Sequence, residues 1–572
     1  MEWFGGVVVA DGFPSSRPVF PTWSRALPSG ELWTVGEGAG FAVTVAEAGQ
    51  LSGAVLGTHT VSADSLRAWL SGNWCSGPPA WAGTYAVVVA HPEGAMVFTD
   101  PAHALPLHYC EVDGSVVWAS SSRALSGLTG TGLDPAWVSN LLMNPVGAHG
   151  RERSAFLGVR TVPPGHILEA RKGGRATVAG WWSPPRTTPR SEASRAFRDA
   201  LERAVAVRLA QAQHLSCDLS GGLDSTTLCL LATQQAAGAR PLTAWTVHPA
   251  STHHGGDLDH AREAARGLSG MTHRLLPLTD AELPYSDLDQ VPPTDEPAPT
   301  TITIARHLFA YKRIRAAGST LHMTGDGGDA LLMQSPELAL RLAVRGRAVR
   351  ALRDLHGWAK LDRGNPFKLL PRVVRPECQS SPGWLTSRAR KLARSGHETS
   401  AVDVLRGDAE LFALHGIGRT AHADAQFAAP FGVRLEAPFL DRTVVEAALA
   451  FRVKDRGSPW SYKPQLTEAL GDLLPGSIAR RRTKGGTDAD HHLGLRAHLP
   501  GVTSLLLDGW LAGNGLIDAQ LLRQELRTAA SGKDTPWGLL DPVVSAEMWG
   551  RAVEASPSPV WSRTQTTQEV SR

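Results

Sequence analysis

The chain has 572 residues, more than one hydrophobic core usually serves, so we expect at least two domains. Hydrophobic residues make up 42% and the formal charge is only +3, so bulk charge gives no reason to expect nucleic acid as a partner. The five cysteines are scattered and form no CxxC pair, which argues against a disulfide framework or a zinc site and favours a reducing compartment.

The first part of the chain, residues 1–185, is rich in strand patterns. Its start has no basic residue before the first apolar run, so we expect no signal peptide, and no apolar stretch is long enough to span a bilayer. Together with the cysteine pattern, this predicts a cytoplasmic protein with no membrane partner. Short apolar runs lie between Gly, Pro and Asp turns and predict a layered β-sandwich domain. The runs are Gly5–Ala10, Tyr85–Ala90, Ala95–Thr99 and Ser115–Ala119.

A Pro- and Arg-rich linker near residues 184–190 is followed by alternating helix and strand patterns. This alternation predicts a parallel sheet with crossover helices. The expected strands are 214–219, 242–247, 272–278 and 320–323, and the expected helices are 191–212, 226–237, 258–268 and 301–317. We expect this second domain to cover residues 190–556 and a polar, disordered tail to cover 557–572.

The strongest chemical signal is the hexapeptide Ser220–Ser225, SGGLDS, between an expected strand and an expected helix. Glycines let the backbone approach a phosphate, and the amides at a helix start point towards it. The two serines add hydroxyl donors, and Asp224 can hold a divalent cation against the phosphates. An ordinary strand-to-helix turn is the plainer interpretation, but the whole hexapeptide in this context favours a nucleotide site.

A second turn, Thr324–Asp329, follows the strand at 320–323. A Gly- and Asp-rich turn is often only structural, but this one would lie at the carboxyl edge of the sheet, where such folds bind ligands. There Asp329 could share a Mg²⁺ ion with Asp224. Asp326 is a candidate for orienting or deprotonating an amine, or alternatively for supporting a nearby metal ligand.

Two further elements complete the series: Gly432–Asp441, and Lys463-Pro464 followed by the basic run Arg480–Gly486. Together, the hexapeptide, the second turn and these elements resemble the synthetase domain of class B asparagine synthetases, β-lactam synthetases and lasso peptide cyclases. The hexapeptide itself resembles the pyrophosphate loop of N-type ATP pyrophosphatases, which leave AMP on the substrate.

The N-terminal part resembles the glutaminase-type domain of the same family. The segments that carry this resemblance are Trp81–Tyr85, Asp100–Tyr109, Ala119–Ser121 and Pro163–His166. The implied fold is an N-terminal glutaminase-like (Ntn-type) β-sandwich followed by an adenine-nucleotide α-hydrolase-like parallel α/β synthetase domain.

The resemblance also implies roles for individual residues, with ATP and Mg²⁺ as cofactors. It implies that Asp224 and Asp329 hold the metal and that Lys484 stabilises charge developing in the transition state, a large catalytic contribution in general. The residues that it implies for ATP binding are Leu219, Ser220, Gly221, Gly222, Leu223, Asp224, Ser225, Val247, Thr324 and Gly325.

The sequence departs from the asparagine synthetase pattern at several positions. Glu2 stands where that pattern has the N-terminal cysteine nucleophile, and a carboxylate cannot replace a thiolate in acyl transfer. We therefore expect a degenerate domain without glutamine hydrolysis. Asp326 replaces a glutamate, and Arg434 and Glu436 exchange the expected Glu and Arg, so conversion of aspartate to asparagine is not expected.

A basic segment, residues 335–397, carries many Arg and Lys residues interleaved with leucines and Trp358. It is either a solvated helical insert or a surface for a peptide substrate or a partner protein. With Glu2 and the Thr324–Asp329 turn, it is most similar to lasso peptide cyclases. The resemblance implies that the enzyme adenylates an Asp or Glu side chain of a precursor core peptide, whose own N-terminal amine closes the macrolactam. A leader-binding protein and a leader peptidase are implied as partners.

Three other functions share much of this pattern. A small-molecule amide or β-lactam synthetase would use the same ATP site, and an ammonia-dependent asparagine synthetase would need only ammonium and aspartate. A nucleic-acid-modifying ATP pyrophosphatase would use the basic segment to bind RNA. The glutaminase-like N-terminal part argues against this last function.

Overall fold

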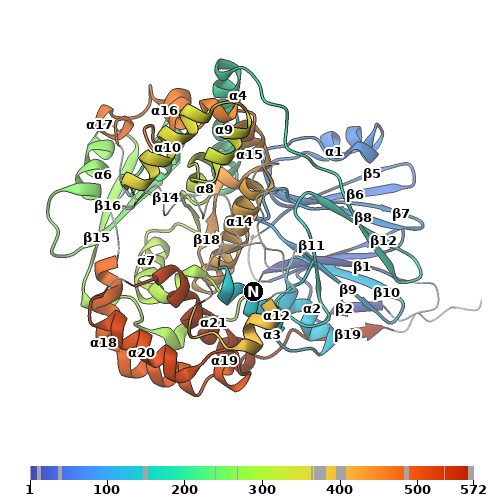
Figure 1. The fold of residues 1–572 in the computed structure, drawn as a ribbon. Coiled ribbons are helices and arrows are strands. Elements are labelled where there is room, and N and C mark those ends of the chain that lie inside the picture. Colours follow the sequence, from blue (N-terminus) through green and yellow to red (C-terminus); the bar gives the residue numbers. More distant parts are fainter. Residues whose placement is uncertain are drawn as a thin grey trace, which may run out of the picture.

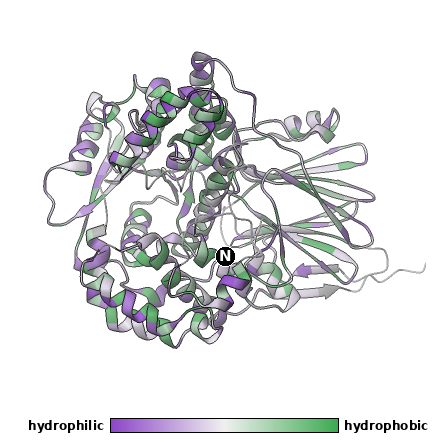
Figure 2. Ribbon diagram, in the orientation of Figure 1, coloured by the Kyte–Doolittle hydropathy of each residue, from purple (hydrophilic) through white to green (hydrophobic). Residues whose placement is uncertain are grey.

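The computed structural model describes residues 2–9, 15–36, 41–145, 152–238, 240–266, 268–361, 365, 382–393, 407–481, 488–533 and 535–564. Two antiparallel sheets lie on one side of the molecule, and a parallel sheet with its helices lies on the other (Figure 1). A mixed α/β protein of this architecture agrees with the fold class expected from the sequence. Figure 2 shows hydrophobic residues alternating with hydrophilic ones along the antiparallel strands and on the central helices.

The N-terminal part forms a sandwich of two six-stranded antiparallel sheets. Strand alternation directs one face of each sheet inward, and the buried layer includes Phe4, Leu56, Val88 and Trp118. The first sheet has the order β11 (Arg160–Val162), β9 (Leu107–Val112), β10 (Ser115–Ala119), β1 (Trp3–Val8), β4 (Gly30–Val35), β3 (Trp23–Leu27). The second has the order β13 (Arg175–Gly180), β12 (His166–Arg171), β8 (Gly94–Phe98), β7 (Gly83–His91), β6 (Leu51–His59), β5 (Ala42–Ala48).

Three helices accompany the sandwich. Helix α1 (Ala63–Leu70) covers β5 and β6, while α2 (Ser122–Thr129) and α3 (Pro135–Met143) follow β10. Side-chain caps explain where these helices begin, since Ser62, Ser121 and Asp134 each accept a hydrogen bond from a first-turn backbone amide.

The second part is built on a five-stranded parallel sheet, as the helix–strand alternation predicts. Its order is β16 (Met271–Leu278), β15 (Leu242–Pro249), β14 (Leu215–Asp218), β17 (Leu321–Met323), β18 (Arg434–Glu436), with every pairing parallel. The carboxyl ends of all five strands therefore meet along one edge, where a ligand site is expected.

Helices cover both faces of this sheet. Long α4 (Arg190–Gln211) packs against α5 (Leu223–Ala236), α15 (Arg442–Leu449) and α16 (Pro464–Leu470), and it buries apolar residues such as Phe197 and Leu201. The other helices of this part are α6 (Gly256–Arg266), α7 (Ile304–Ala316), α8 (Gly328–Leu332), α9 (Leu338–Val344), α10 (Ala348–Leu361), α14 (Asp408–Ala428) and α17 (Gly476–Ala479). Helix α12 (Ser387–Ala393) instead packs against α3 of the N-terminal part. The C-terminal group is α18 (Asp488–Leu507), α19 (Trp510–Gly513), α20 (Ala519–Ala530) and α21 (Trp537–Ala555).

The two parts of the molecule are joined by a buried polar network. The Arg208 side chain on α4 is fully buried, and its guanidinium contacts the carboxylates of Asp441 at 2.5 Å and Glu436 at 3.0 Å. From the sandwich, Thr58 donates to Glu436 at 2.6 Å and Thr84 donates to Asp441 at 3.0 Å. Two strands of the sandwich therefore hold the segment that follows β18.

The expectation of a disordered tail after residue 556 is wrong for the described residues 557–564. Strand β19 (Trp561–Thr564) pairs antiparallel with β2 (Ser15–Pro18), far away in the sequence. The indole of Trp561 contacts the rings of Trp3 and Trp33 and donates a hydrogen bond to the Ala124 carbonyl at 2.8 Å. A large aromatic side chain therefore anchors a segment whose average composition is polar.

In the part of the chain that the structure describes, no helix combines the length and the apolar character needed to cross a bilayer.

Candidate active site

The Ser220–Ser225 hexapeptide forms the turn between β14 and α5, at the carboxyl edge of the parallel sheet. Gly221 has φ +76°, and a Cβ there would lie 2.3 Å from the Asp257 carbonyl oxygen, so only glycine fits. The hydroxyls of Ser220 and Ser225 lie 2.8 Å apart, and the Ser220 backbone amide donates to Ser225 at 3.2 Å. These contacts hold the turn open at the start of α5, where backbone amides can receive a phosphate.

The second turn, Thr324–Asp329, lies directly against the first. A Cβ on Gly325 would lie 3.1 Å from the Ser225 amide nitrogen, and one on Gly328 would lie 2.4 Å from Cγ of Asp224. Glycine is therefore needed for the close approach of the two turns. The sequence places Asp224 and Asp329 on separate elements, and the structure brings them together as predicted.

Lys463 lies between these two aspartates, and sequence reasoning gave it no role. Its side chain is 1% exposed, and its Nζ makes ion pairs with Asp224 and, at 2.5 Å, with Asp329. Burial alone would lower the pKa of Lys463, but the two carboxylates more than offset this and raise the pKa. Lys463 adopts the left-handed conformation, with φ +45°, just before Pro464 starts α16.

The same two carboxylates fit a magnesium site. They already face one cation from opposite sides, and Mg²⁺ in nucleotide sites takes one or two carboxylates together with phosphate oxygens and water. Among the described residues, no group of three or more His, Cys, Asp or Glu side chains could hold a metal by itself. A metal here would therefore depend on oxygens of the nucleotide.

The basic run Arg480–Gly486 follows α17. Arg481 donates to the Gly221 carbonyl at 2.7 Å and forms an ion pair with Asp257, so it holds the glycine turn against α6. Lys484, to which the resemblance gave the catalytic charge, lies outside the described residues.

Four of the residues implied for ATP binding, Leu219, Val247, Thr324 and Gly325, would line the adenine and ribose by the family resemblance, and they differ in exposure. The Leu219 side chain is fully buried in the core, and its backbone amide and carbonyl bind Trp245 and Thr246. Val247 is half-buried at the end of β15, and Thr324 and Gly325 are half-buried after β17. The backbone of Leu219 and the side chain of Val247 therefore lie along the edge, but the Leu219 side chain is turned away from solvent.

Asp326 is exposed at the same edge, and it accepts a hydrogen bond from Thr324 at 2.7 Å. A second carboxylate close by, Asp424 on α14, was missed by sequence reasoning. Burial raises the pKa of Asp424 to about 7, hydrogen bonds from Thr300 oppose the rise, and the negative charge of Asp326 contributes to it.

The buried hydroxyl of Tyr311 on α7 has no hydrogen-bond partner in the described part of the chain.

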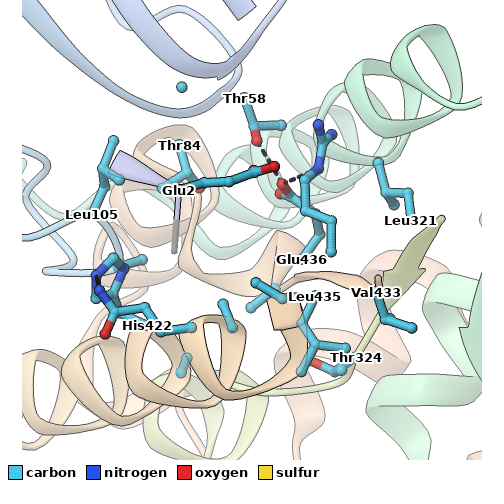
Figure 3. A pocket seen from close by; sticks show the side chains of 18 of the residues that line it. Glu2, Thr58, Thr84, Leu105, Leu321, Thr324, His422, Val433, Leu435 and Glu436 are labelled. Atoms are coloured by element: carbon cyan, nitrogen blue, oxygen red, sulfur yellow. Dashed lines mark hydrogen bonds and ion pairs between the residues drawn. The ribbon is translucent and has the colours of Figure 1, made fainter. Parts of the chain in front are cut away.

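A cavity of about 460 Å³ extends from this turn into the interface between the two parts of the molecule. Its lining includes Asp326 and Thr324 at the sheet edge and Glu2 on the sandwich side. Figure 3 shows Glu2 and Thr58 from the N-terminal part and His422 and Thr324 from the second part around this space. Burial raises the pKa of Glu2, and the nearby Arg434 partly offsets the rise.

Arg434 and Glu436, the exchanged pair, have structural partners in this interface. Arg434 donates to Gln211 at 2.6 Å and lies 3.2 Å from the Glu436 carboxylate. Glu436 is buried and bound to Arg208 and Thr58. The exchange therefore serves the contact between the two parts of the molecule.

A family model described as asparagine synthase matches residues 196–551, more than half of the chain. The chain therefore belongs to the asparagine synthase family.

One curated relative has a more specific name. Carboxyethyl-arginine beta-lactam-synthase of Streptomyces clavuligerus is 30% identical over 210 residues, which cover 36% of this chain and 38% of that protein. The matched region thus spans little more than a third of the relative's length.

Two of the solved structures that match this chain superpose poorly on it. The U34-tRNA thiolase NcsA from Methanococcus maripaludis is 16% identical, with 39% of this chain and 79% of that chain covered and a TM-score of 0.19. Glutamine phosphoribosylpyrophosphate amidotransferase from B. subtilis is 14% identical, with 56% and 75% covered and a TM-score of 0.19. Scores this low support no conclusion about function.

Proposed function

We propose that this protein is a lasso peptide cyclase, an ATP- and Mg²⁺-dependent macrolactam synthetase. In this proposal it activates an Asp or Glu side chain of a core peptide with ATP, and the peptide's N-terminal amine attacks the acyl-adenylate. An isopeptide bond forms, and AMP and pyrophosphate are released.

The observation that carries this proposal is the arrangement of Asp224, Lys463 and Asp329 beside the glycine turn. The turn can receive phosphates, the two carboxylates can hold Mg²⁺, and the buried ammonium beside them would stabilise the negative charge that builds up as pyrophosphate leaves. When bound, the metal would neutralise phosphate charge. The chain's own residues position the phosphates, and Lys463 stabilises the transition state.

A second observation limits the source of the amine. The interface cavity reaches Glu2, but no cysteine is among the residues that line it within the described chain. Without a thiol, a glutaminase reaction has no nucleophile there. The amine must therefore reach Asp326 from the substrate or from solution.

The acceptor end of the site has residues suited to receiving an amine. An incoming ammonium must lose a proton before it attacks, and a carboxylate whose pKa lies near 7 is well matched to accept it. We assign this role to Asp326 together with Asp424, and Lys484 stays a candidate for the second cation over the phosphates.

The finer domain assignment belongs to the same proposal. Residues 1–185 are a degenerate glutaminase-like (Ntn-type) domain that supports the synthetase through Thr58 and Thr84, and residues 190–556 are an adenine-nucleotide α-hydrolase-like synthetase domain. The precursor core peptide is the substrate, and a leader-binding protein and a leader peptidase are the proposed partners in the cytoplasm.

The test uses the full chain with ATP, Mg²⁺ and a panel of synthetic peptides. Each peptide has a free N-terminal amine and one Asp or Glu, whose position differs from one peptide to the next. The assay measures AMP formation and the mass of the peptide after reaction. Loss of one water with equimolar AMP supports cyclisation, and the Asp224→Ala variant is the inactive control. If no peptide in the panel, offered with or without its leader and partner proteins, yields AMP, the cyclase proposal fails.

A small-molecule amide or β-lactam synthetase is the second candidate, favoured by the name of the 30% identical relative. Amino acids bearing both a carboxylate and an amine replace the peptides in the same assay. AMP formed with those compounds but with no peptide would select this candidate, and asparagine formed from aspartate and ammonium would select an ammonia-dependent asparagine synthetase.

A further inference from the structure

Helices α9 and α10 present an exposed surface that the proposed chemistry does not use. The surface, here named the α9–α10 face, carries the most exposed large hydrophobic side chains of this region: Val349 is 84% exposed, Leu352 68%, Val344 65% and Leu361 54%. The other residues of the face are Arg345, Arg347, Arg353, His356 and Lys360, all exposed. Single exposed apolar residues are ordinary, but Val349 and Leu352 lie one turn apart on α10, and such neighbouring apolar side chains can bind a partner.

The face is cationic, and few of its basic side chains have acidic partners among the described residues. Arg345, Arg347 and Lys360 form no ion pair with any described residue, and Arg353 makes only a long contact with Asp354, at 3.7 Å. Asp354 is buried on the opposite side of α10, where it accepts the indole N–H of Trp460 at 3.1 Å. An occupant of the face would therefore meet positive charge and aliphatic side chains together.

The inner side of the same helices is firmly packed. Leu338, Leu342 and Leu355 form a small core with Val453. The Arg350 guanidinium donates to the Lys454 carbonyl at 3.0 Å. The outer apolar residues are therefore exposed on a fixed support, which lowers the entropy cost of binding.

The face is joined to the catalytic residues at both ends. Helix α9 follows α8, whose first turn carries Asp329 (Figure 1). Gly357 lies against Trp460, so closely that a Cβ would be 2.8 Å from its indole ring. Lys463 follows three residues later and lies between the two aspartates. A segment bound on the α9–α10 face would thus lie on helices that adjoin the elements carrying Asp329 and Lys463.

We infer that the α9–α10 face docks an acidic, amphipathic segment of the peptide substrate, outside the part that forms the ring. This inference rests on the proposed function, because it assigns a second contact to that same substrate. Val349 and Leu352 are one helical turn apart, as an apolar stripe requires, and Arg353 and Lys360 flank them on the same side.

Other occupants fit this surface less well. A second copy of the chain would bring the same positive charge against itself. Nucleic acid would use the arginines but would leave Val349 and Leu352 exposed beside phosphates. An anionic membrane could use both features, so it becomes an outcome of the test.

The test is a binding measurement without ATP, by fluorescence anisotropy on the full chain. The probe is a labelled synthetic peptide of about 15 residues with leucines at i, i+3, i+4 and i+7 and glutamates elsewhere. The control peptide keeps the leucines and replaces every glutamate with lysine. We expect the acidic probe to bind, the lysine peptide not to bind, and the affinity to fall as salt screens the charges.

Two double variants locate the binding. Arg353→Glu with Lys360→Glu is expected to weaken the acidic probe about tenfold or more, and Val349→Ser with Leu352→Ser to weaken it by a similar factor. The matched control is Arg195→Glu with Arg203→Glu, two exposed arginines on α4, which is expected to bind like the parent. All changed residues are exposed, so thermal melting should show intact folding.

The outcomes separate this inference from the proposed function. Equal binding by parent and face variants, or no binding of the acidic probe, overturns the docking site. Binding to vesicles of phosphatidylserine and phosphatidylcholine that depends on the face, without peptide binding, also overturns it and indicates a membrane surface. The binding measurement involves no turnover. It can therefore be interpreted even if the cyclase assay yields no AMP.

Discussion

Replacing Lys463 with methionine tests the central arrangement of the site. Methionine keeps much of the buried stem but removes the ammonium between Asp224 and Asp329. Breaking a fully buried pair costs about 3–5 kcal/mol. Here the Asp329 side chain is 49% exposed and solvent screens it, while the Asp224 side chain is 14% exposed, so we expect a loss of about 2 kcal/mol.

The same variant should respond differently to Mg²⁺. With the ammonium gone, the two carboxylates repel each other, and a divalent cation between them relieves the repulsion. At about 100 times its Kd, Mg²⁺ would return about 2.7 kcal/mol by mass action. We therefore expect Mg²⁺ to raise the Tm of the Lys463→Met variant more than that of the parent.

Activity gives an independent measure of the same change. AMP formation should fall about 10²–10³-fold, as when one preorganised donor to developing charge is lost. Lys454→Met, an exposed lysine of the same segment, is the control. If the Lys463 variant keeps both the parent's Mg²⁺ response and its rate of AMP formation, the ammonium has neither the structural nor the catalytic role argued here.

Three further changes test other parts of the site. Gly328→Ala pushes a methyl group into the Asp224 carboxylate and should abolish AMP formation, whereas Gly501→Ala, with open space around its Cβ, should leave the rate unchanged. Arg208→Met removes the fully buried cation shared by Asp441 and Glu436, and leaves Asp441 with only the Thr84 hydroxyl among the contacts described above. It should lower stability by about 3–5 kcal/mol in urea denaturation, and a loss below about 1 kcal/mol would contradict the network. Because the folded pKa of Asp424 is raised to about 7, its contribution to stability decreases as pH rises from about 4 to 7. Asp424→Asn should flatten this part of the profile of Tm against pH, and an unchanged slope would refute the assignment.

The architecture could be predicted because its signals are local. Alternation of apolar residues predicts the sandwich strands, and the helix–strand alternation predicts the parallel sheet. The two turns, Ser220–Ser225 and Thr324–Asp329, could be placed at one edge because the carboxyl ends of parallel strands meet there.

The parts that were missed depend on contacts across the chain. Lys463-Pro464 belongs to the elements that carry the family resemblance, but nothing local shows that the chain turns the lysine inward between two acids. Asp424 lies in an amphipathic helix, where an acid usually faces solvent, and only the packing of α14 against the second turn gives it a raised pKa. Glu436 and Arg434 stood out as an exchange of charges, but their partners Arg208 and Gln211 lie more than two hundred residues away.

The pairing of β19 with β2 affects whether parts of the chain can be expressed separately. Trp561 of β19 packs beside Trp3 and Trp33 of the N-terminal sandwich. Separating the sandwich from the rest of the chain would therefore expose aromatic side chains on both fragments. Separately expressed halves should therefore precipitate or recombine.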